Sequence, residues 1–288
     1  MTPENFKHLA QLLKLKSGLI VTEDKQYLIE TRLTPVARRA GLSNLDDLVV
    51  ALRKPGATAL VNTVVDAMTT NETFFFRDKT PFDLLENTIL PELRDKRTGR
   101  RLRIWCAAAS TGQEPYSIAM VLKEQAAKMA GWTYDILGTD ISPSVLEKAR
   151  KASYSQFEVQ RGLPIQLLLK YFTQVGDSWN LNADIKQMVH YKPLNLLDNL
   201  MALGKFDIVF CRNVLIYFDR DTKAEILSRV AKQMAPDAYL VLGAAETVVG
   251  VTDAFVPVPG KRGLYALKDG AAGAAPAPAA APRFKVAV

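Results

Sequence analysis

The sequence has few of the residues that build metal centres or disulfide frameworks. Its 288 residues include two cysteines and two histidines. Cys106 and Cys211 each lie in an apolar, strand-like run, where a reduced and buried thiol is the ordinary state. His8 and His190 are far apart and have no cysteine or carboxylate at ligand spacing. We therefore expect neither a disulfide nor a metal site.

Long hydrophobic runs and a leader pattern are also missing. No stretch approaches the roughly 20 uninterrupted apolar residues that a membrane-spanning helix needs. The first residues, MTPENFKHLA, lack the basic-then-apolar pattern of a signal peptide. We therefore expect a cytoplasmic protein with no direct insertion into a membrane.

The glycine pattern of dinucleotide-binding folds is absent from the turn where it would be expected. The run WCAAASTGQEPYSIA contains small residues instead, which argues against NAD or FAD. Small side chains let a ligand approach the backbone, and Gly112 can adopt conformations closed to other residues. Glu114 would repel a phosphate but could bind the ammonium group of an amino acid. Close helix packing is the alternative explanation for the small residues.

Positive charge is in excess. The chain has 37 lysines and arginines against 30 aspartates and glutamates, a formal net charge of +7. Such a balance suggests an acidic partner, which could be nucleic acid, an anionic membrane surface or an acidic protein segment. A soluble surface that happens to be basic explains the charge equally well.

The N-terminal quarter has apolar residues at helical spacing. From Asn5 to about Met68 this spacing predicts a bundle of short helices. Lys25, Arg32 and Arg39 are seven residues apart and so would lie along one helical face, with Arg38 beside them. This stripe could dock an acidic helix, or it could be a solvated face.

After Pro81 the pattern changes to apolar strands that alternate with helices. The strands are RLRIWCAAA, TYDILGTDI, KFDIVFCRNVLIYF and AYLVLGAAE. Such alternation predicts an α/β fold, a Rossmann-like parallel sheet with helices on both faces. Ligands of such sheets bind beyond the carboxyl ends of the strands.

The alternation breaks between Ser155 and Pro193. Two short strand-like pieces, SWNLN and IKQMVHY, predict a small antiparallel hairpin. We therefore predict an all-α helical domain with a linker over residues 1–78 and an α/β domain over 79–268, with an inserted β-subdomain over 155–193. Residues 269–288 are rich in alanine and proline, which predicts a disordered tail.

Polar residues stand at three places that favour ligand contacts. Asp140 ends the strand in LGTDIS, where an acidic residue can accept hydrogen bonds from both ribose hydroxyls of an adenosine, although it could instead cap the next helix. Arg212 and Asn213 interrupt an otherwise apolar run, and buried polar groups are costly unless they are hydrogen-bonded. In MTTNETFFFRD, three phenylalanines hold Asn71, Thr73 and Arg77 close to an aromatic surface.

At these residues the chain resembles the bacterial chemotaxis receptor methyltransferases, which methylate glutamates on chemoreceptors. The matching segments, in order, are NETFFFRD, RIWCAAASTGQEPYSIAM, ILGTDIS, LNLLD and FDIVFCRNVLIYFD. The resemblance runs from near the start to about Lys268. It implies a fold that binds S-adenosylmethionine (SAM) as the methyl donor and releases S-adenosylhomocysteine (SAH) as the product. It implies no bound metal.

The resemblance also implies the site. The cofactor-binding residues would be Asn71, Thr73, Arg77, Glu114, Asp140, Asn195, Leu196, Arg212 and Asn213. Arg77 would lie close to the methionine carboxylate or the transferring methyl group, and Tyr217 would lie nearest the methyl path. These two would be the catalytic residues.

Individual contacts follow from the same match. Glu114 would lie near the amino group of the cofactor, and Asp140 would hold the ribose. Asn195 and Leu196 would lie near the adenine. Arg212 and Asn213 would lie on the other side of the cofactor.

The implied partner is the cytoplasmic helical domain of transmembrane chemoreceptors, bound by a monomer without nucleic acid. Family members differ in whether the inserted hairpin grips a receptor peptide, and the stretch between Phe172 and Asn195 is short for that task. Recognition would then depend on Lys25, Arg32, Arg38 and Arg39. We expect substitution of Arg32 and Arg39 by glutamate to abolish receptor methylation and leave cofactor affinity intact.

Two alternatives remain open at this point. Nucleic acid would also explain the basic charge, although CRNVLIYF lacks the polar-aromatic NPPY-like segment used to methylate nucleobase amines. A protein that binds the cofactor as a sensor or scaffold, without turnover, would share most of these motifs.

Overall fold

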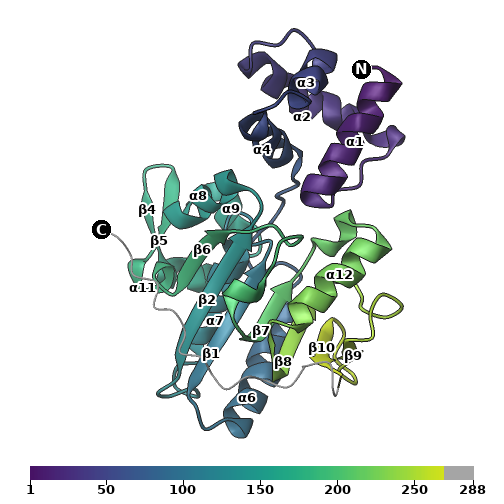
Figure 1. The fold of residues 1–288 in the computed structure, drawn as a ribbon. Helices are drawn as coiled ribbons and strands as arrows, with labels where there is room; N and C mark the ends of the chain where they lie inside the picture. Colours follow the sequence, from purple (N-terminus) through teal and green to yellow (C-terminus); the bar gives the residue numbers. More distant parts are fainter. Residues whose placement is uncertain (269–288) are drawn as a thin grey trace.

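The N-terminal part of the computed structural model, which describes residues 1–268, is built of helices (Figure 1). They are α1 (Pro3–Ser17), the short 3-10 helix η1 (Glu23–Lys25), α2 (Gln26–Arg39), α3 (Leu45–Leu52) and α4 (Thr58–Met68). Thr2 caps α1 by accepting a hydrogen bond from the Asn5 amide, and Gly18, at φ 75°, ends it. The apolar faces of α1, α2, α3 and α4 are buried in one shared core. Lys25 lies in η1, so the predicted basic stripe is not carried by one helix.

The main sheet has seven strands in the order β6-β2-β1-β7-β8-β10-β9. Parallel neighbours are β6 (Val189–Pro193), β2 (Thr133–Asp140), β1 (Arg101–Ala107), β7 (Phe206–Cys211) and β8 (Met234–Leu242). β10 (Leu264–Leu267) and β9 (Phe255–Pro257) extend one edge in the antiparallel direction. The α/β fold class is confirmed, and the sheet is mixed rather than purely parallel.

Helices cover both faces of this sheet because successive strand residues point to opposite sides. Ile104 and Cys106 join a core with the helices on one face, whereas Trp105 and Ala107 join a second core that includes α12 (Arg220–Ala231). The other helices of this part are α5 (Thr80–Leu84), the π-helical turn η2 (Leu85–Ile89), α6 (Leu90–Lys96), α7 (Gln113–Glu124) and α8 (Pro143–Lys151).

A second, smaller sheet lies to one side of the main one (Figure 1). It has the order β3-β5-β4, with β3 (Ser153–Ser155), β4 (Phe172–Val175) and β5 (Ser178–Leu181), all paired antiparallel. The helices α9 (Gln156–Gln160), α10 (Ile165–Tyr171) and α11 (Ala183–Lys186) accompany it.

The predicted hairpin between SWNLN and IKQMVHY is wrong. β5 pairs instead with β4 across the two-residue turn Gly176–Asp177, with Val175 opposite Ser178. This Gly-Asp turn is a standard hairpin signal that the prediction overlooked. The second piece divides into α11 and β6, and β6 belongs to the main sheet, where Val189 pairs in parallel with Ile136. The domain boundaries at 78 and 268 stay predictions, and the predicted tail lies outside the described residues.

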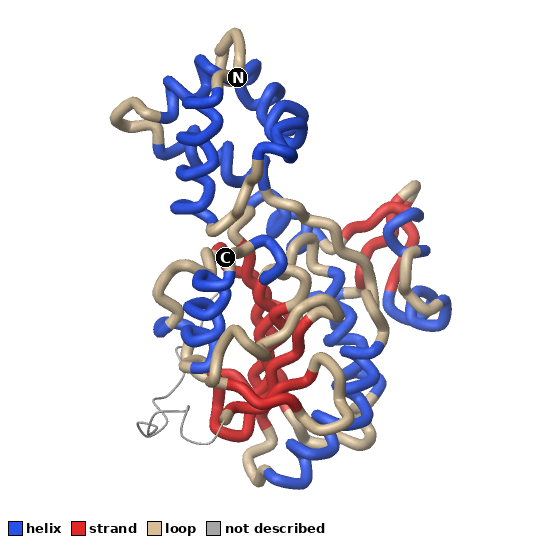
Figure 2. Tube along the Cα trace, turned by 90° about the vertical axis from the view of Figure 1, so that its right-hand side faces the viewer, coloured by secondary structure: helices blue, strands red, loops and turns tan. Residues whose placement is uncertain are grey.

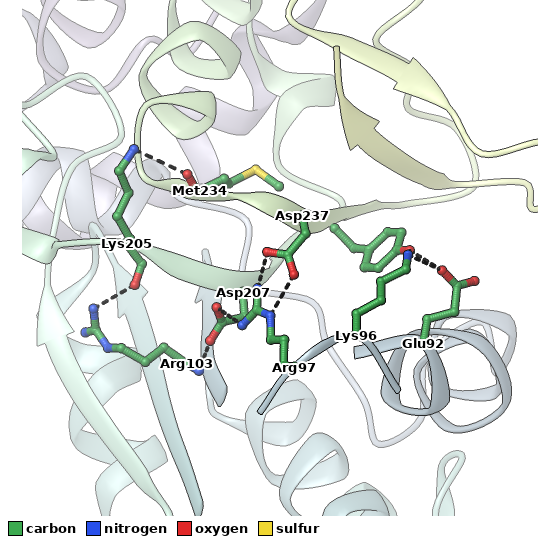
Figure 3. Close-up of polar contacts among 9 residues, drawn as sticks. Glu92, Lys96, Arg97, Arg103, Lys205, Asp207, Met234 and Asp237 are labelled. Carbon is green, nitrogen blue, oxygen red and sulfur yellow. Dashed lines mark hydrogen bonds and ion pairs between the residues drawn. The ribbon is translucent and has the colours of Figure 1, made fainter. Parts of the chain in front are cut away.

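At the edge where β1, β7 and β8 begin, charged side chains form a network (Figure 3). Arg97, after α6, pairs with both Asp207 on β7 and Asp237 on β8. Asp207 also accepts the Arg103 amide at 2.6 Å, and Lys205 donates to the Met234 carbonyl at 3.3 Å. These contacts join β1, β7, β8 and the residue after α6 at the end of the sheet opposite the carboxyl ends of the strands. We therefore infer that the network stabilises the fold.

Candidate cofactor site

A cleft opens at the carboxyl ends of β1, β2 and β7, between the sheet and the N-terminal helices. Its space is about 860 Å³, counting the part open to solvent. In Figure 2 the N-terminal helices lie beyond one end of the strands, with loops between the two parts. The lining includes Ser17, Leu19, Val65, Thr69, Thr70, Asn71, Glu72, Thr73, Arg77, Ala108, Ser110, Glu114, Asp140, Ile141, Arg212, Asn213, Val214, Tyr217 and Phe218.

The turn after β1 has an unusual backbone. Ala108 (φ 61°), Ser110 (φ 49°) and Gly112 (φ 92°) all lie in the left-handed region. A Cβ atom on Gly112 would come within 2.7 Å of the Tyr191 hydroxyl, so only glycine fits there. The small residues therefore bend the chain sharply and leave backbone exposed to the cleft.

Asp140 joins the ends of β1 and β2. Its Oδ2 accepts the Ser110 amide at 2.9 Å, and its Oδ1 accepts the Ser142 amide at 3.0 Å. Burial raises the pKa of Asp140, whose exposed fraction is 6%. The N-cap of α8 is Ser142, whose hydroxyl accepts the Val145 amide, so the alternative that Asp140 caps this helix is wrong. Each carboxylate oxygen keeps a second lone pair for a ligand in the cleft.

Arg212, directly after β7, lies at the centre of a buried polar cluster. Its Nη1 donates to Glu114 Oε2 at 2.6 Å, and its Nη2 donates to Asp78 Oδ2 at 2.9 Å and to the Arg77 carbonyl at 2.7 Å. Burial raises the pKa of Glu114, and the guanidinium of Arg212 opposes that rise. Within residues 1–268, Arg212 Nε is buried without a hydrogen-bond partner.

The linker after α4 crosses the cleft and is anchored by its aromatic residues. Phe75 is fully buried against Tyr154 and Phe172. Arg77 donates through Nη1 to the Glu72 carbonyl at 2.7 Å. Asn71, Thr73 and Arg77 of this linker all line the cleft, and their contact with the cofactor stays a prediction.

The segment after β7 also lines the cleft, through Arg212, Asn213, Val214, Tyr217 and Phe218. Asn213 has a left-handed backbone (φ 57°), and Tyr217 lies in the 3-10 helix η4 (Leu215–Tyr217). The Tyr217 carbonyl accepts the Ile20 amide at 3.2 Å, so the chain after α1 closes this side of the cleft.

Two predicted cofactor residues do not line the cleft. Asn195 donates through Nδ2 to the Lys16 carbonyl at 2.6 Å and accepts the Leu197 amide at 3.0 Å. Leu196 is buried in the core beside α12. In this structure Asn195 links the loop after β6 to the end of α1, and neither residue forms a wall of the cleft.

The four basic residues predicted to bind substrate lie outside the cleft and differ among themselves. Lys25, Arg38 and Arg39 are exposed. Arg32 turns inward, and its guanidinium donates to the Met68 carbonyl at 2.7 Å and the Thr69 carbonyl at 3.0 Å. The structure therefore does not bring these four side chains to one free surface.

Glu246 is a residue that the sequence reasoning missed. Its carboxylate accepts four backbone amides, from Asn213, Val214, Leu215 and Gly243, at 2.7–2.9 Å. It thereby fixes the wall that contains Arg212 and Asn213. The available signal was its position shortly after β8, because the predicted site residues Asp140 and Arg212 also lie at the carboxyl ends of strands.

Other missed cleft residues gave no local signal. Ser17, Leu19 and Val65 come from the N-terminal helices and the chain after α1. They reach the cleft only because the helical part lies over the carboxyl ends of the strands.

The fold and the acidic residue at the end of β2 place the chain among the α/β enzymes that bind a nucleoside cofactor at the carboxyl edge of the sheet. Family comparison makes this specific. Residues 71–264 match the family model described as CheR methyltransferase, SAM binding domain, and residues 4–69 match that described as CheR methyltransferase, all-alpha domain. The chain therefore belongs to the CheR methyltransferase family, and it is a SAM-dependent methyltransferase.

Curated relatives agree over most of the chain. A chemotaxis protein methyltransferase of Vibrio parahaemolyticus is 38% identical over 272 residues, 93% of this chain and 98% of that protein. Chemotaxis protein methyltransferase 1 of Pseudomonas aeruginosa is 40% identical over 86% of this chain and 92% of its own length. The Escherichia coli chemotaxis protein methyltransferase is 33% identical over 85% of both chains.

Neither a membrane-spanning helix nor a metal centre emerges from the described part of the chain. None of the helices within residues 1–268 is both long and apolar enough to cross a bilayer. The same residues hold no group of three or more histidine, cysteine or carboxylate side chains arranged around a metal ion.

Proposed function

We propose that this protein methylates glutamate side chains in the cytoplasmic helical domain of chemoreceptors, using SAM and acting as a cytoplasmic monomer. The supporting observation is a single cleft that combines a buried carboxylate, Asp140, with the paired Glu114 and Arg212 and with the cationic Arg77. The similarity to chemotaxis protein methyltransferases supports a substrate among the chemotaxis proteins.

The residues present suit the cofactor. Asp140 offers free lone pairs to the two ribose hydroxyls, and Glu114 offers a carboxylate to the ammonium group. The buried, unpartnered Nε of Arg212 can donate to a polar group of a ligand. The sharp turn at Ala108 and Ser110 lets the cofactor approach the backbone. We assign Asn71, Thr73 and Asn213 to the same site because they line the same cleft.

The chemistry needs positioning more than proton transfer. When bound, SAM supplies an electrophilic methyl group. A glutamate side chain, with a reference pKa of about 4.3, is already ionised at neutral pH, so no general base is required. The protein aligns the acid and excludes water, which raises the reactivity of a carboxylate.

We assign two side chains to this alignment. Arg77 lines the cleft, and its guanidinium can steer an incoming carboxylate. Tyr217 lies on the wall formed after β7, and we assign it to orienting the acceptor. The product ester is neutral, so each turnover removes one negative charge from the receptor.

Receptor docking is assigned to the exposed cations of the helical part. Lys25, Arg38 and Arg39 lie on η1 and at the end of α2, where an acidic receptor helix could bind them. Arg32 contributes less directly to this surface, since linker atoms occupy its guanidinium.

Incubation of the protein with methyl-labelled SAM and receptor-containing membranes tests the proposal. Label should appear in receptor peptides, be released by mild base as expected for an ester, and map to glutamates. Filter binding to DNA and RNA at physiological salt addresses the rival reading of the basic charge. Tight SAH binding without any ester would favour a sensor and contradict the proposal.

A further inference from the structure

Arg32 is hydrogen-bonded to the linker that follows α4, whereas the other two arginines of α2, Arg38 and Arg39, are exposed. Its Nη1 donates to the Met68 carbonyl at 2.7 Å and to the Thr69 carbonyl at 3.0 Å. Its Nη2 donates to Thr70 Oγ1 at 3.0 Å. One guanidinium therefore fixes the end of α4 and the first two residues after it.

Those linker residues form part of the cofactor cleft. Thr69 and Thr70 both line it. A third lining residue, Asn71, is tied to Thr69, because Asn71 Nδ2 donates to Thr69 Oγ1 at 3.0 Å. A shift of Thr69 would therefore change the wall of the cleft directly.

The contacts continue to the residue assigned to the ribose. The Asn71 carbonyl accepts the Ser110 hydroxyl at 2.8 Å, and the Ser110 amide donates to Asp140 Oδ2 at 2.9 Å. Residue by residue, hydrogen bonds therefore lead from Arg32 on α2 through Thr69, Asn71 and Ser110 to Asp140. The path joins the helical part to the end of the β2 strand.

We propose that Arg32 is a positioning residue that holds residues 69–71 in the conformation that closes the cofactor cleft. It contacts neither the reacting atoms nor the cleft itself, and acts through the linker. The inference rests on the proposed placement of the cofactor in this cleft. It gives Arg32 a task different from that of the exposed Arg38 and Arg39 on the same helix, and it replaces the expectation from the sequence that substitution of Arg32 leaves cofactor affinity intact.

A simpler role for Arg32 is to cap α4. The last carbonyls of a helix lack partners within it, and a cation near them is stabilising. A cap of this kind would contribute to the stability of the helical part, but its loss would leave the affinity of the folded protein for SAH unchanged. Cofactor affinity therefore separates the two roles.

Calorimetric titration of the full chain with SAH tests the proposal in four proteins: the parent, Arg32→Ala, Arg32→Lys and Lys54→Ala. Lys54 is an exposed cation of the same helical part with no side-chain hydrogen bond or ion pair to residues 1–268, so its substitution controls for the loss of charge. SAH carries no net charge, so a distant positive charge should affect its binding little.

We expect Arg32→Ala to weaken SAH binding about tenfold or more and Lys54→Ala to leave it within twofold. Arg32→Lys should fall between them, because an ammonium cannot make the same forked contacts. In methyl transfer, Arg32→Ala should raise KM for SAM more than it lowers kcat. Amide exchange should quicken in residues 69–73 but not in β1.

The inference would be overturned if Arg32→Ala unfolds cooperatively and binds SAH within twofold of the parent. Should that variant not fold, Arg32→Lys decides by the same criterion. If the parent itself fails to bind SAH, the proposed cofactor site falls, and this inference falls with it. A parent that binds beside an unaffected variant refutes the positioning role alone.

Discussion

Arg212 Nη1 and Glu114 Oε2 lie 2.6 Å apart in a buried ion pair that joins the end of β7 to the first turn of α7. Their side chains are 1% and 11% exposed. Removing one member of such a pair leaves an uncompensated buried charge, which costs about 3–5 kcal/mol. We expect Arg212→Leu to lower the free energy of unfolding by about this amount, measured by urea denaturation.

Glu114→Gln should cost less stability, since a neutral amide can still accept a hydrogen bond from Arg212. It should nevertheless weaken SAH binding, because the ammonium group loses its carboxylate partner. Equal stability losses in the two variants would contradict this reading of the pair.

Cofactor affinity should depend on pH through Asp140. Burial raises the pKa of Asp140 above its ordinary value, and ribose hydroxyls donate best to its ionised form. Affinity for SAH should therefore be full above this raised pKa and fall as pH decreases through it. In the folded protein Asp140 should keep its proton to a higher pH than in the unfolded chain. The free energy of unfolding should therefore decrease as pH rises from the ordinary aspartate pKa to the raised pKa of Asp140.

Titrations of SAH between pH 4 and pH 8 check this expectation. Glu114 also has a pKa raised by burial, so the comparison uses Asp140→Asn and Glu114→Gln separately. Asp140→Asn should bind SAH weakly, and its SAH affinity should depend less on pH than that of the parent. An unchanged profile in both variants would refute the assignment.

Glu246 should matter for binding although it is assigned no contact with the cofactor. Glutamine has one acceptor oxygen where Glu246 uses two to accept four amides, so Glu246→Gln leaves backbone donors without their partner. We expect a loss of stability of about 2 kcal/mol and an SAH affinity at least fivefold weaker. Glu225→Gln, on the exposed side of α12, is the matched control and should change neither.

The network around Arg97 should affect stability alone. Arg97→Ala removes the partner of Asp207, which is 14% exposed, and should cost about 2 kcal/mol. SAH affinity should not change, because the network lies where β1, β7 and β8 begin, whereas the cleft lies at the carboxyl ends of the strands. Urea denaturation and calorimetry on the same protein check both statements.

Acid should weaken the same network. Arg97 lowers the pKa of Asp237, so the stabilisation is present above the ordinary aspartate pKa and is lost as pH falls through the lowered value. In Arg97→Ala this part of the acid dependence should be smaller. An identical acid transition in both proteins would show that the pair contributes little.

Charge reversal at Arg38 and Arg39, which we assign to receptor docking, should separate docking from cofactor binding. Arg38→Glu combined with Arg39→Glu should reduce receptor methylation at least tenfold, since like charges would face an acidic helix. SAH affinity should be retained because both side chains are exposed and lie outside the cleft. Lys128→Glu with Lys151→Glu reverses the same number of charges elsewhere and should methylate normally.

Sequence reasoning placed residues at the cleft where a single strand and the residue at its end carried the signal. Asp140 and Arg212 could be placed because Asp140 ends an apolar strand and Arg212 directly follows one, and the carboxyl ends of parallel strands share one edge. Glu114 followed from its position in the first turn of a helix. These residues all line the cleft in the structure.

Sequence reasoning gave no guide where contacts between distant parts of the chain determine the position of a side chain or the pairing of a strand. Nothing local reveals that Asn195 bonds to the Lys16 carbonyl or that Arg32 turns toward the linker. The pairing of β5 with β4 was missed because β6 also reads as a short apolar strand, and only its parallel pairing with β2 shows that it belongs to the main sheet. Helical periodicity predicted the face of the helix on which Arg32 lies, but it could not predict that this face contacts the linker after α4.

The most direct test of the account is calorimetric titration of SAH into the parent chain and into Asp140→Ala. The account predicts saturable binding at one site per chain in the parent and a loss of at least a hundredfold in the variant. No heat of binding in the parent, or equal affinities in the two proteins, would contradict the placement of the cofactor at the carboxyl edge of the sheet.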